Sequence, residues 1–151
     1  MMPKTVIRRR LQPTLYVCGF LLLGGLHPSV VQAKPSQEAA LYAEVRAAVD
    51  SGLKFLRSQQ DKGGSYGHYP GLTAMVVEAF ALSHRAYRED DGPFIRKAIE
   101  SLLKLQRENG AIFDQNLPSY NTALALLALR SVDNPAHAKA IVRAQRFLVG
   151  L

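Results

Sequence analysis

A unit of about 46 residues occurs more than once in this chain, and a repeat of that length restricts the fold more than any other feature. The matched pairs are Gln60 with Gln106 (106 minus 60 gives 46), Gly64 with Gly110, and, after two periods, Phe55-Leu56 with Phe147-Leu148. Repeats of this length are typical of helix pairs that stack side by side and bury an apolar face between neighbours.

The spacing of apolar residues predicts helices and no strand. Apolar residues recur every three or four positions in three segments, which predicts helices with one buried face. These segments are 36–60, 93–109 and 135–151. Two others, 70–87 and 119–131, contain runs that are apolar nearly all round, at 72–82 and 123–129, which is typical of helices buried on both sides. The predicted fold class is therefore all-α.

Amphipathic helices and helices that are apolar all round alternate along the chain, which predicts antiparallel helix hairpins. An outer amphipathic helix, a glycine turn and an inner apolar helix make one hairpin. Hairpins are expected at about 38–87 and 93–131, followed by an unpaired helix at 135–151. Together they form a partial repeat domain over 34–151.

The first 33 residues have the layout of a secretory signal peptide, 1–33. A basic segment is followed by an apolar run from Leu15 to Leu26 and by Val31-Gln32-Ala33, which predicts cleavage after Ala33 and a periplasmic or extracellular protein. The alternative is a membrane anchor, but this run of about 12 residues is shorter than the roughly 20 that a spanning helix needs.

Removal of this segment would take away the one cysteine, Cys18, and four of the 19 basic residues. The remainder then has no disulfide and no thiolate nucleophile. Its charge is 15 basic against 12 acidic residues, or +3, and these are scattered, so no nucleic-acid partner is expected.

The turn sequence resembles a known repeat. The pattern Leu-x-x-x-Gln-x-x-x-Gly-Ser-Tyr-Gly at 56–67, followed by Pro-Gly-Leu-Thr-Ala, is similar to the repeat of prenyltransferases and squalene or hopene cyclases. The second copy, at 106–113 and 120–124, resembles it with a shift of one position. The resemblance covers 38–151 and implies a partial α/α toroid with inner and outer helices.

The resemblance also implies structural roles in the turns. The glutamine after each outer helix is expected to tie neighbouring helix ends together, with the glycine and the aromatic residue beside it. The residues concerned are Gln60, Gly64 and Tyr66 in the first unit, and Gln106 and Gly110 in the second. Such roles concern stability and say nothing about a substrate.

The catalytic motifs of that family have no full match here. Squalene-type cyclases use an Asp-x-Asp-Asp acid, and the nearest sequence, Glu89-Asp90-Asp91, is expected to be a solvated turn. Protein prenyltransferases hold zinc with Asp, Cys and His, whereas His68, His84 and His137 have no ligand spacing. We therefore expect no metal and no cofactor, and the sequence does not decide whether the protein is an enzyme.

Glu78 is the candidate catalytic residue, because it is the one charge within the apolar segment 72–82. A buried carboxyl group has a raised pKa and can act as an acid. The alternative is that Glu78 faces the rim of the helix ends or an unfilled groove.

The candidate binding residues all precede inner helices. They are His68, Tyr69, Asp114 and Tyr120, with Tyr66 and Asn121 in the same group. Inner-helix ends line one mouth of a toroid, so these residues are expected to converge there. The alternative is that they only form turns and helix caps.

Five helices leave the last one without an inner partner, so we expect the sequence to be part of a longer protein. Self-association through the inner helices and an unstable product are the alternatives. The predicted function is an exported, non-catalytic module that binds a lipid, glycan or protein on its concave inner face, with no stable membrane span. The alternatives are the front part of a terpenoid cyclase or prenyltransferase, with its acid motif beyond Leu151, and a plain helical solenoid for protein contacts.

Overall fold

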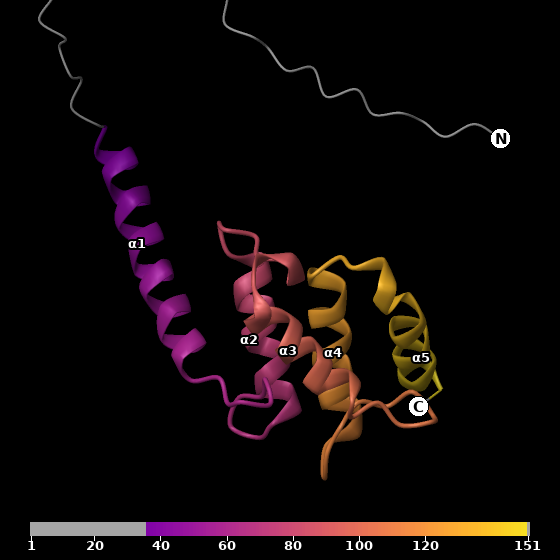
Figure 1. Cartoon of the computed structure of the whole chain (residues 1–151). Helices are drawn as coiled ribbons and strands as arrows, with labels where there is room; N and C mark the ends of the chain where they lie inside the picture. Colours follow the sequence, from indigo (N-terminus) through magenta and orange to yellow (C-terminus); the bar gives the residue numbers. More distant parts are fainter. Residues whose placement is uncertain (1–35, 151) are drawn as a thin grey trace, which may run out of the picture. The chain divides into compact units, whose positions relative to one another are not determined.

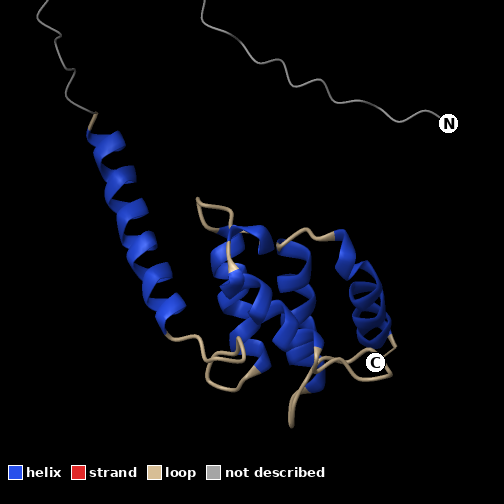
Figure 2. Ribbon diagram, viewed as in Figure 1, coloured by secondary structure: helices blue, strands red, loops and turns tan. Residues whose placement is uncertain are grey.

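The structure, a computed structural model, describes residues 36–150, and these form helices joined by turns (Figures 1 and 2). The helices are α1 (Gln37–Ser58), α2 (Pro70–Leu82), η1 (Glu89–Asp91), α3 (Pro93–Leu103), α4 (Pro118–Ser131), η2 (Pro135–His137) and α5 (Ala138–Val149). Within 36–150 there is no strand beyond one isolated bridge, so the predicted all-α class is confirmed. The predicted signal peptide lies outside the described residues. None of the described helices has both the length and the apolar character needed to cross a membrane.

Capping residues set where the helices begin. The Ser36 hydroxyl accepts a hydrogen bond from the amide of Ala39 (3.2 Å) at the start of α1. Four of the described helices begin with a proline, namely α2, α3, α4 and η2 at Pro70, Pro93, Pro118 and Pro135. Proline suits this position because a first-turn amide has no partner within the helix and the ring already fixes a helical φ.

The expected helix over 70–87 is wrong at its end, because α2 stops at Leu82. The Ser83 hydroxyl donates to the carbonyl of Phe80 (2.8 Å), and the chain then turns back until the amide of Tyr87 donates to the same carbonyl (3.3 Å). The Tyr87 ring lies edge-on to Phe80 and Phe94, at 5.5 and 5.7 Å between centroids. An aromatic cluster thus replaces the last predicted turn of helix.

The core lies around α2 and α4, which pack against each other more extensively than any other pair of helices. Figure 1 shows α2, α3 and α4 together, and α5 packs on α4. Among the largest fully buried side chains are Val77, Ile95, Ile99, Leu102, Ile112 and Leu129. Helices α2, α3 and α4 and the turn at Ile112 therefore contribute side chains to a common core.

The prediction that 70–87 and 119–131 are buried all round is wrong on one face of each helix. On α2 the exposed apolar residues are Leu72, Met75 and Leu82. On α4 Leu127 is also exposed. These faces are open because the main neighbours of α2 are α3 and α4, and those of α4 are α2 and α5, so each helix is covered on part of its circumference.

Helix α1 makes few contacts with the rest, and Leu53 is its one buried residue. The predicted buried face is therefore wrong for the first half of this helix, where Leu41 and Val45 are exposed. A bidentate ion pair joins its second half to the turn after α2, with Arg85 Nε and Nη2 at 2.9 and 2.5 Å from the Asp50 carboxylate. The hydrogen bond from Arg85 is the main reason why the pKa of Asp50 lies below its usual value, although desolvation opposes it.

Two glycines permit a close approach of backbones. Gly64 and Gly110 both have φ of 93°, a left-handed conformation that favours glycine. A Cβ at Gly64 would lie closer than 3.0 Å to the carbonyl of Lys97, and one at Gly110 would meet the carbonyl of Arg143 in the same way. Each turn can therefore rest on the backbone of a later helix, α3 or α5, only because the residue has no side chain.

We predict that Gly64→Ala and Gly110→Ala each lower the free energy of unfolding by about 3 kcal/mol or more, from backbone strain together with steric overlap. Urea denaturation monitored by circular dichroism measures this loss. Gly52→Ala is the control, because nothing lies within 4 Å of its added Cβ in the middle of α1. That change should stabilise the protein by about 0.5–1 kcal/mol. Equal midpoints for the three variants would contradict the account.

Candidate functional site

The turn after α1 is fixed by the side chain of Gln60. Its Nε2 donates to the carbonyl of Gly64 (3.0 Å) within the turn and to the carbonyl of Phe94 (2.8 Å) in the first turn of α3. One amide group therefore closes the turn and joins it to α3. The guanidinium of Arg57 lies over the Phe94 ring, 4.4 Å from its centroid, and adds a second contact between the end of α1 and the start of α3.

The turn after α3 contains the same arrangement. Gln106 Nε2 donates to the carbonyl of Gly110 (3.2 Å) and to the carbonyl of Ala140 (2.9 Å) in the first turn of α5. Both long bonds span 34 residues. The turn residues expected from the resemblance thus make hydrogen bonds at positions 46 apart.

A buried threonine then connects each turn to the helix that follows it, α2 or α4. The amide of Tyr66 donates to Thr73 Oγ1 (3.0 Å), and the amide of Ile112 donates to Thr122 Oγ1 (2.9 Å). Tyr66 is itself buried, and this burial raises the pKa of its hydroxyl to about 12. These bonds determine where the segments that precede α2 and α4 lie.

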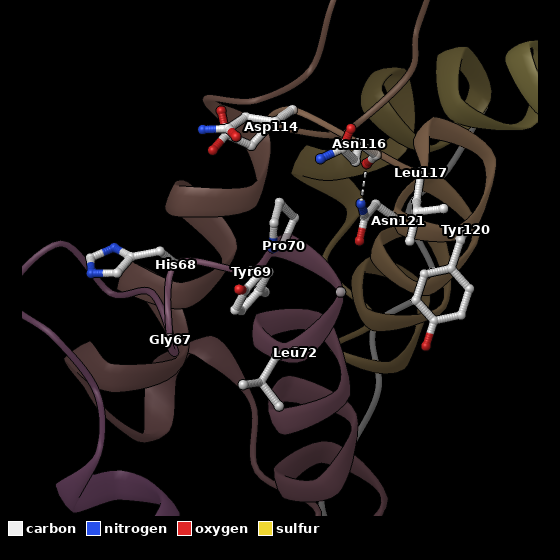
Figure 3. Close-up of a pocket in the computed structure, with 12 residues that line it drawn as sticks. Gly67, His68, Tyr69, Pro70, Leu72, Asp114, Asn116, Leu117, Tyr120 and Asn121 are labelled. Carbon is white, nitrogen blue, oxygen red and sulfur yellow. Dashed lines mark hydrogen bonds between the residues drawn. The ribbon is translucent and has the colours of Figure 1, made fainter.

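Those two segments enclose a cleft of about 590 Å³ at the amino ends of α2 and α4 (Figure 3). The four candidate binding residues His68, Tyr69, Asp114 and Tyr120 all line it. The remaining lining residues are Gly67, Pro70, Gly71, Leu72, Gln115, Asn116, Leu117 and Asn121. Tyr66, by contrast, is in the core and does not reach the cleft.

The aromatic side chains of the cleft are open to solvent. Tyr69 is 71% exposed and Tyr120 is 56% exposed, so both rings present apolar surface that nothing among residues 36–150 covers. The His68 side chain is more exposed still and lies 4.0 Å from the Asp61 carboxylate. The backbone carbonyl of Asp114 accepts from the guanidinium of Arg107 (3.2 Å), which fixes the second segment.

The amide of Asn121 has a defined orientation. Its Nδ2 donates to the carbonyl of Asn116 (2.8 Å), as Figure 3 shows. The Oδ1 atom then lies beside Gly71, where an added Cβ would come within 2.7 Å of it. The missing side chain of Gly71 therefore allows the Asn121 amide to pack directly against the start of α2.

Two lining residues have strained backbones. His68 and Leu117 have φ of 60° and 55°, a conformation that costs an ordinary residue roughly 1–2 kcal/mol. Leu117 is also an exposed apolar residue, so burial does not offset the strain. Strain without a gain in packing is more frequent at functional sites than elsewhere.

Sequence reasoning missed Gly71, Asn116 and Leu117 as members of the site. The place of Leu117 directly before a first-turn proline was an available signal, because such a residue is restricted in conformation. Gly71 lay in the quoted motif but had no assigned role. Its importance depends on α4, which is distant in sequence.

Glu78 lies on α2 but not in the cleft. It is half-buried and makes no hydrogen bond or ion pair with any described residue. Desolvation raises the pKa of its carboxyl group. Thr73 and Thr122, which accept equivalent hydrogen bonds, are 49 residues apart, and by that offset Glu78 matches Leu127 on α4. Leu127 is exposed, which puts both positions on an open face.

The acidic sequence Glu89-Asp90-Asp91 is only partly the solvated turn that was expected. Asp90 is fully exposed, but the Glu89 side chain is 12% exposed and contacts Nε2 of His137, itself 11% exposed. Glu89 also accepts from Asn134 Nδ2 (3.2 Å). The polar contact joins the turn before α3 to the turn before α5, so Glu89 is positioned between helices and not in open solvent.

Over the described part of the chain, no group of three or more His, Cys, Asp or Glu side chains is placed to hold a metal ion. Comparison with protein-family models, curated proteins and solved structures gave no match. The cleft, its two tyrosines and its oriented amide are therefore the observations from which a function is argued.

We predict that Leu117→Gly raises the free energy of unfolding by about 0.5–1 kcal/mol, because relief of left-handed strain exceeds the entropy that glycine loses on folding. Leu127→Gly is the matched control, since Leu127 is similarly exposed but lies inside α4. It should lower stability by roughly 1 kcal/mol. Urea titrations of both variants measure the difference, and a destabilised Leu117→Gly protein would contradict the strain argument.

Proposed function

We propose that this chain is an exported, non-catalytic binding module, built from helix hairpins in the manner of the α/α toroids of prenyltransferases and squalene cyclases. Its ligand occupies the cleft between the segments 67–72 and 114–121. The observation that carries the proposal is that the four residues singled out by their position before inner helices line one cavity. Rigid helices position these loop residues, which is the usual arrangement of a binding site.

The repeated joints support the toroid part of the proposal. Each turn bonds to the first turn of the next outer helix through a glutamine, and each inner helix receives the turn through a threonine. Because these hydrogen bonds recur, each hairpin is expected to pack on the next one in the same orientation. Such nearest-neighbour packing is what builds curved helical arrays.

The open flank of α2 supports the same arrangement. Thr73 in α2 and Thr122 in α4 accept equivalent hydrogen bonds, so residues of the two helices correspond at an offset of 49. By that offset Leu72 and Met75 correspond to Asn121 and Leu124, which lie against α2 at Gly71. The face of α4 that packs on α2 thus has a counterpart on α2, at Leu72 and Met75, and this counterpart is exposed. A further inner helix of the same type has a complementary place to pack.

The contacts of the acidic sequence favour binding over catalysis. Glu89 is occupied by His137 and Asn134, and the Asp91 carboxylate accepts from the amide of Arg88 (2.6 Å). An acid that protonates an alkene must reach its substrate. These two carboxyl groups instead hold turns together.

One observation favours a second candidate function, an enzyme of the terpenoid-cyclase or prenyltransferase type. Glu78 has a raised pKa, no partner among the described residues and a place on an open apolar face. A carboxyl group in such a setting is a candidate acid. In that case turnover, and not binding alone, would depend on Glu78.

A fragment screen by two-dimensional amide NMR tests the binding proposal on the full chain. We predict that ligands from a chemically mixed small-molecule library shift amides in 67–72 and 114–121 in a saturable way. Shifts confined to other surfaces would contradict the proposal. Each ligand found is then incubated with the protein and with Glu78→Gln. Conversion of a ligand that Glu78→Gln abolishes would establish the enzyme instead.

A further inference from the structure

We infer that the cleft between 67–72 and 114–121 binds a neutral saccharide, an inference that rests on the proposed binding function and specifies its ligand. The inference combines three properties of the lining residues: their charge, their two exposed tyrosines and their oriented polar groups. The volume of about 590 Å³ lies within the roughly 300–1,000 Å³ of small-molecule sites and has room for a short oligosaccharide.

The charge of the lining argues against anionic ligands. None of the twelve lining residues is lysine or arginine, and Asp114 is the one carboxylate. Arg107 does not line the cleft, and its guanidinium donates to the Asp114 backbone carbonyl and lies 5.3 Å from the centroid of the Phe113 ring. Phosphate or uronate groups would meet a carboxylate here without a compensating cation.

The tyrosines supply the surface that a sugar ring needs. A pyranose has faces of C–H groups and an edge of hydroxyls, so it packs its face on an aromatic ring while its edge remains hydrogen-bonded. Tyr69 and Tyr120 are exposed on separate helices, at the amino ends of α2 and α4. Two such surfaces in one cleft suit a ligand of more than one ring.

The polar groups argue against a purely apolar ligand. Asn116, Asn121, Gln115 and Asp114 contribute side-chain amides and a carboxylate to the same lining. A lipid tail would desolvate these groups without replacing their bonds to water, which costs free energy for each group left unpaired. Hydroxyl groups both donate and accept, so they can satisfy the oriented Oδ1 of Asn121 beside Gly71.

The test uses the full chain, expressed with its N-terminal segment, on an array that carries neutral and acidic oligosaccharides. Binders are confirmed in solution by calorimetry. We expect at least one neutral oligosaccharide to bind, and Tyr69→Ala and Tyr120→Ala each to weaken it by about tenfold or more. Tyr42→Ala is the matched control, because Tyr42 is 59% exposed on α1 and outside the cleft, and it should bind as the unaltered chain does.

Asp114→Asn distinguishes two ligand classes, a neutral saccharide and a cation that the tyrosines and the Asp114 carboxylate would bind. Choline is the cationic probe, and choline binding to the unaltered chain that Asp114→Asn abolishes would show a cation site and overturn the inference. Failure of every neutral oligosaccharide to bind at millimolar concentration would overturn the inference, as would equal weakening by Tyr42→Ala. If fragments still shift the cleft amides in that case, the proposed binding function stands and only the ligand class is wrong.

Discussion

The described fold depends on one hydrogen-bonding arrangement, a glutamine amide that bridges a turn and the following helix. Gln60 and Gln106 each use one nitrogen to reach two backbone carbonyls, one within the turn and one 34 residues away. Both glutamines are partly buried, so loss of the amide would leave carbonyls without partners and not simply return them to water. The left-handed glycines allow the close approach that these bonds require.

The candidate site follows from these joints. The turn held by Gln60 continues through Tyr66 and Thr73 into α2, and this path places the segment 67–70 at the mouth of the cleft. The second turn does the same for the segment that leads into α4. Because α2 and α4 pack closely, two loops distant in sequence meet at one place. The cleft is therefore a consequence of the structural contacts, and its chemistry depends on side chains that the joints do not use.

Much of the fold was predictable from sequence because its signals are local: apolar spacing, first-turn prolines and glycine turns depend on neighbouring residues. The grouping of His68, Tyr69, Asp114 and Tyr120 was predictable too, since the first three precede an apolar helix and Tyr120 lies in the first turn of one. The contact of Glu89 with His137 was not, because it depends on how two turns lie across the core. The end of α2 at Leu82 was missed for a similar reason, since it depends on the packing of Tyr87 against Phe80 and Phe94.

Urea denaturation of Gln60→Ala, Gln106→Ala and Gln59→Ala tests most directly whether the glutamine bridges hold the structure together. Gln59 is the control because its side-chain amide donates only to the neighbouring Ser58 hydroxyl (3.1 Å) at an exposed site. The account predicts that each bridging variant loses about 1–3 kcal/mol of unfolding free energy. It predicts a loss below about 0.5 kcal/mol for Gln59→Ala. Three variants of equal stability would contradict it.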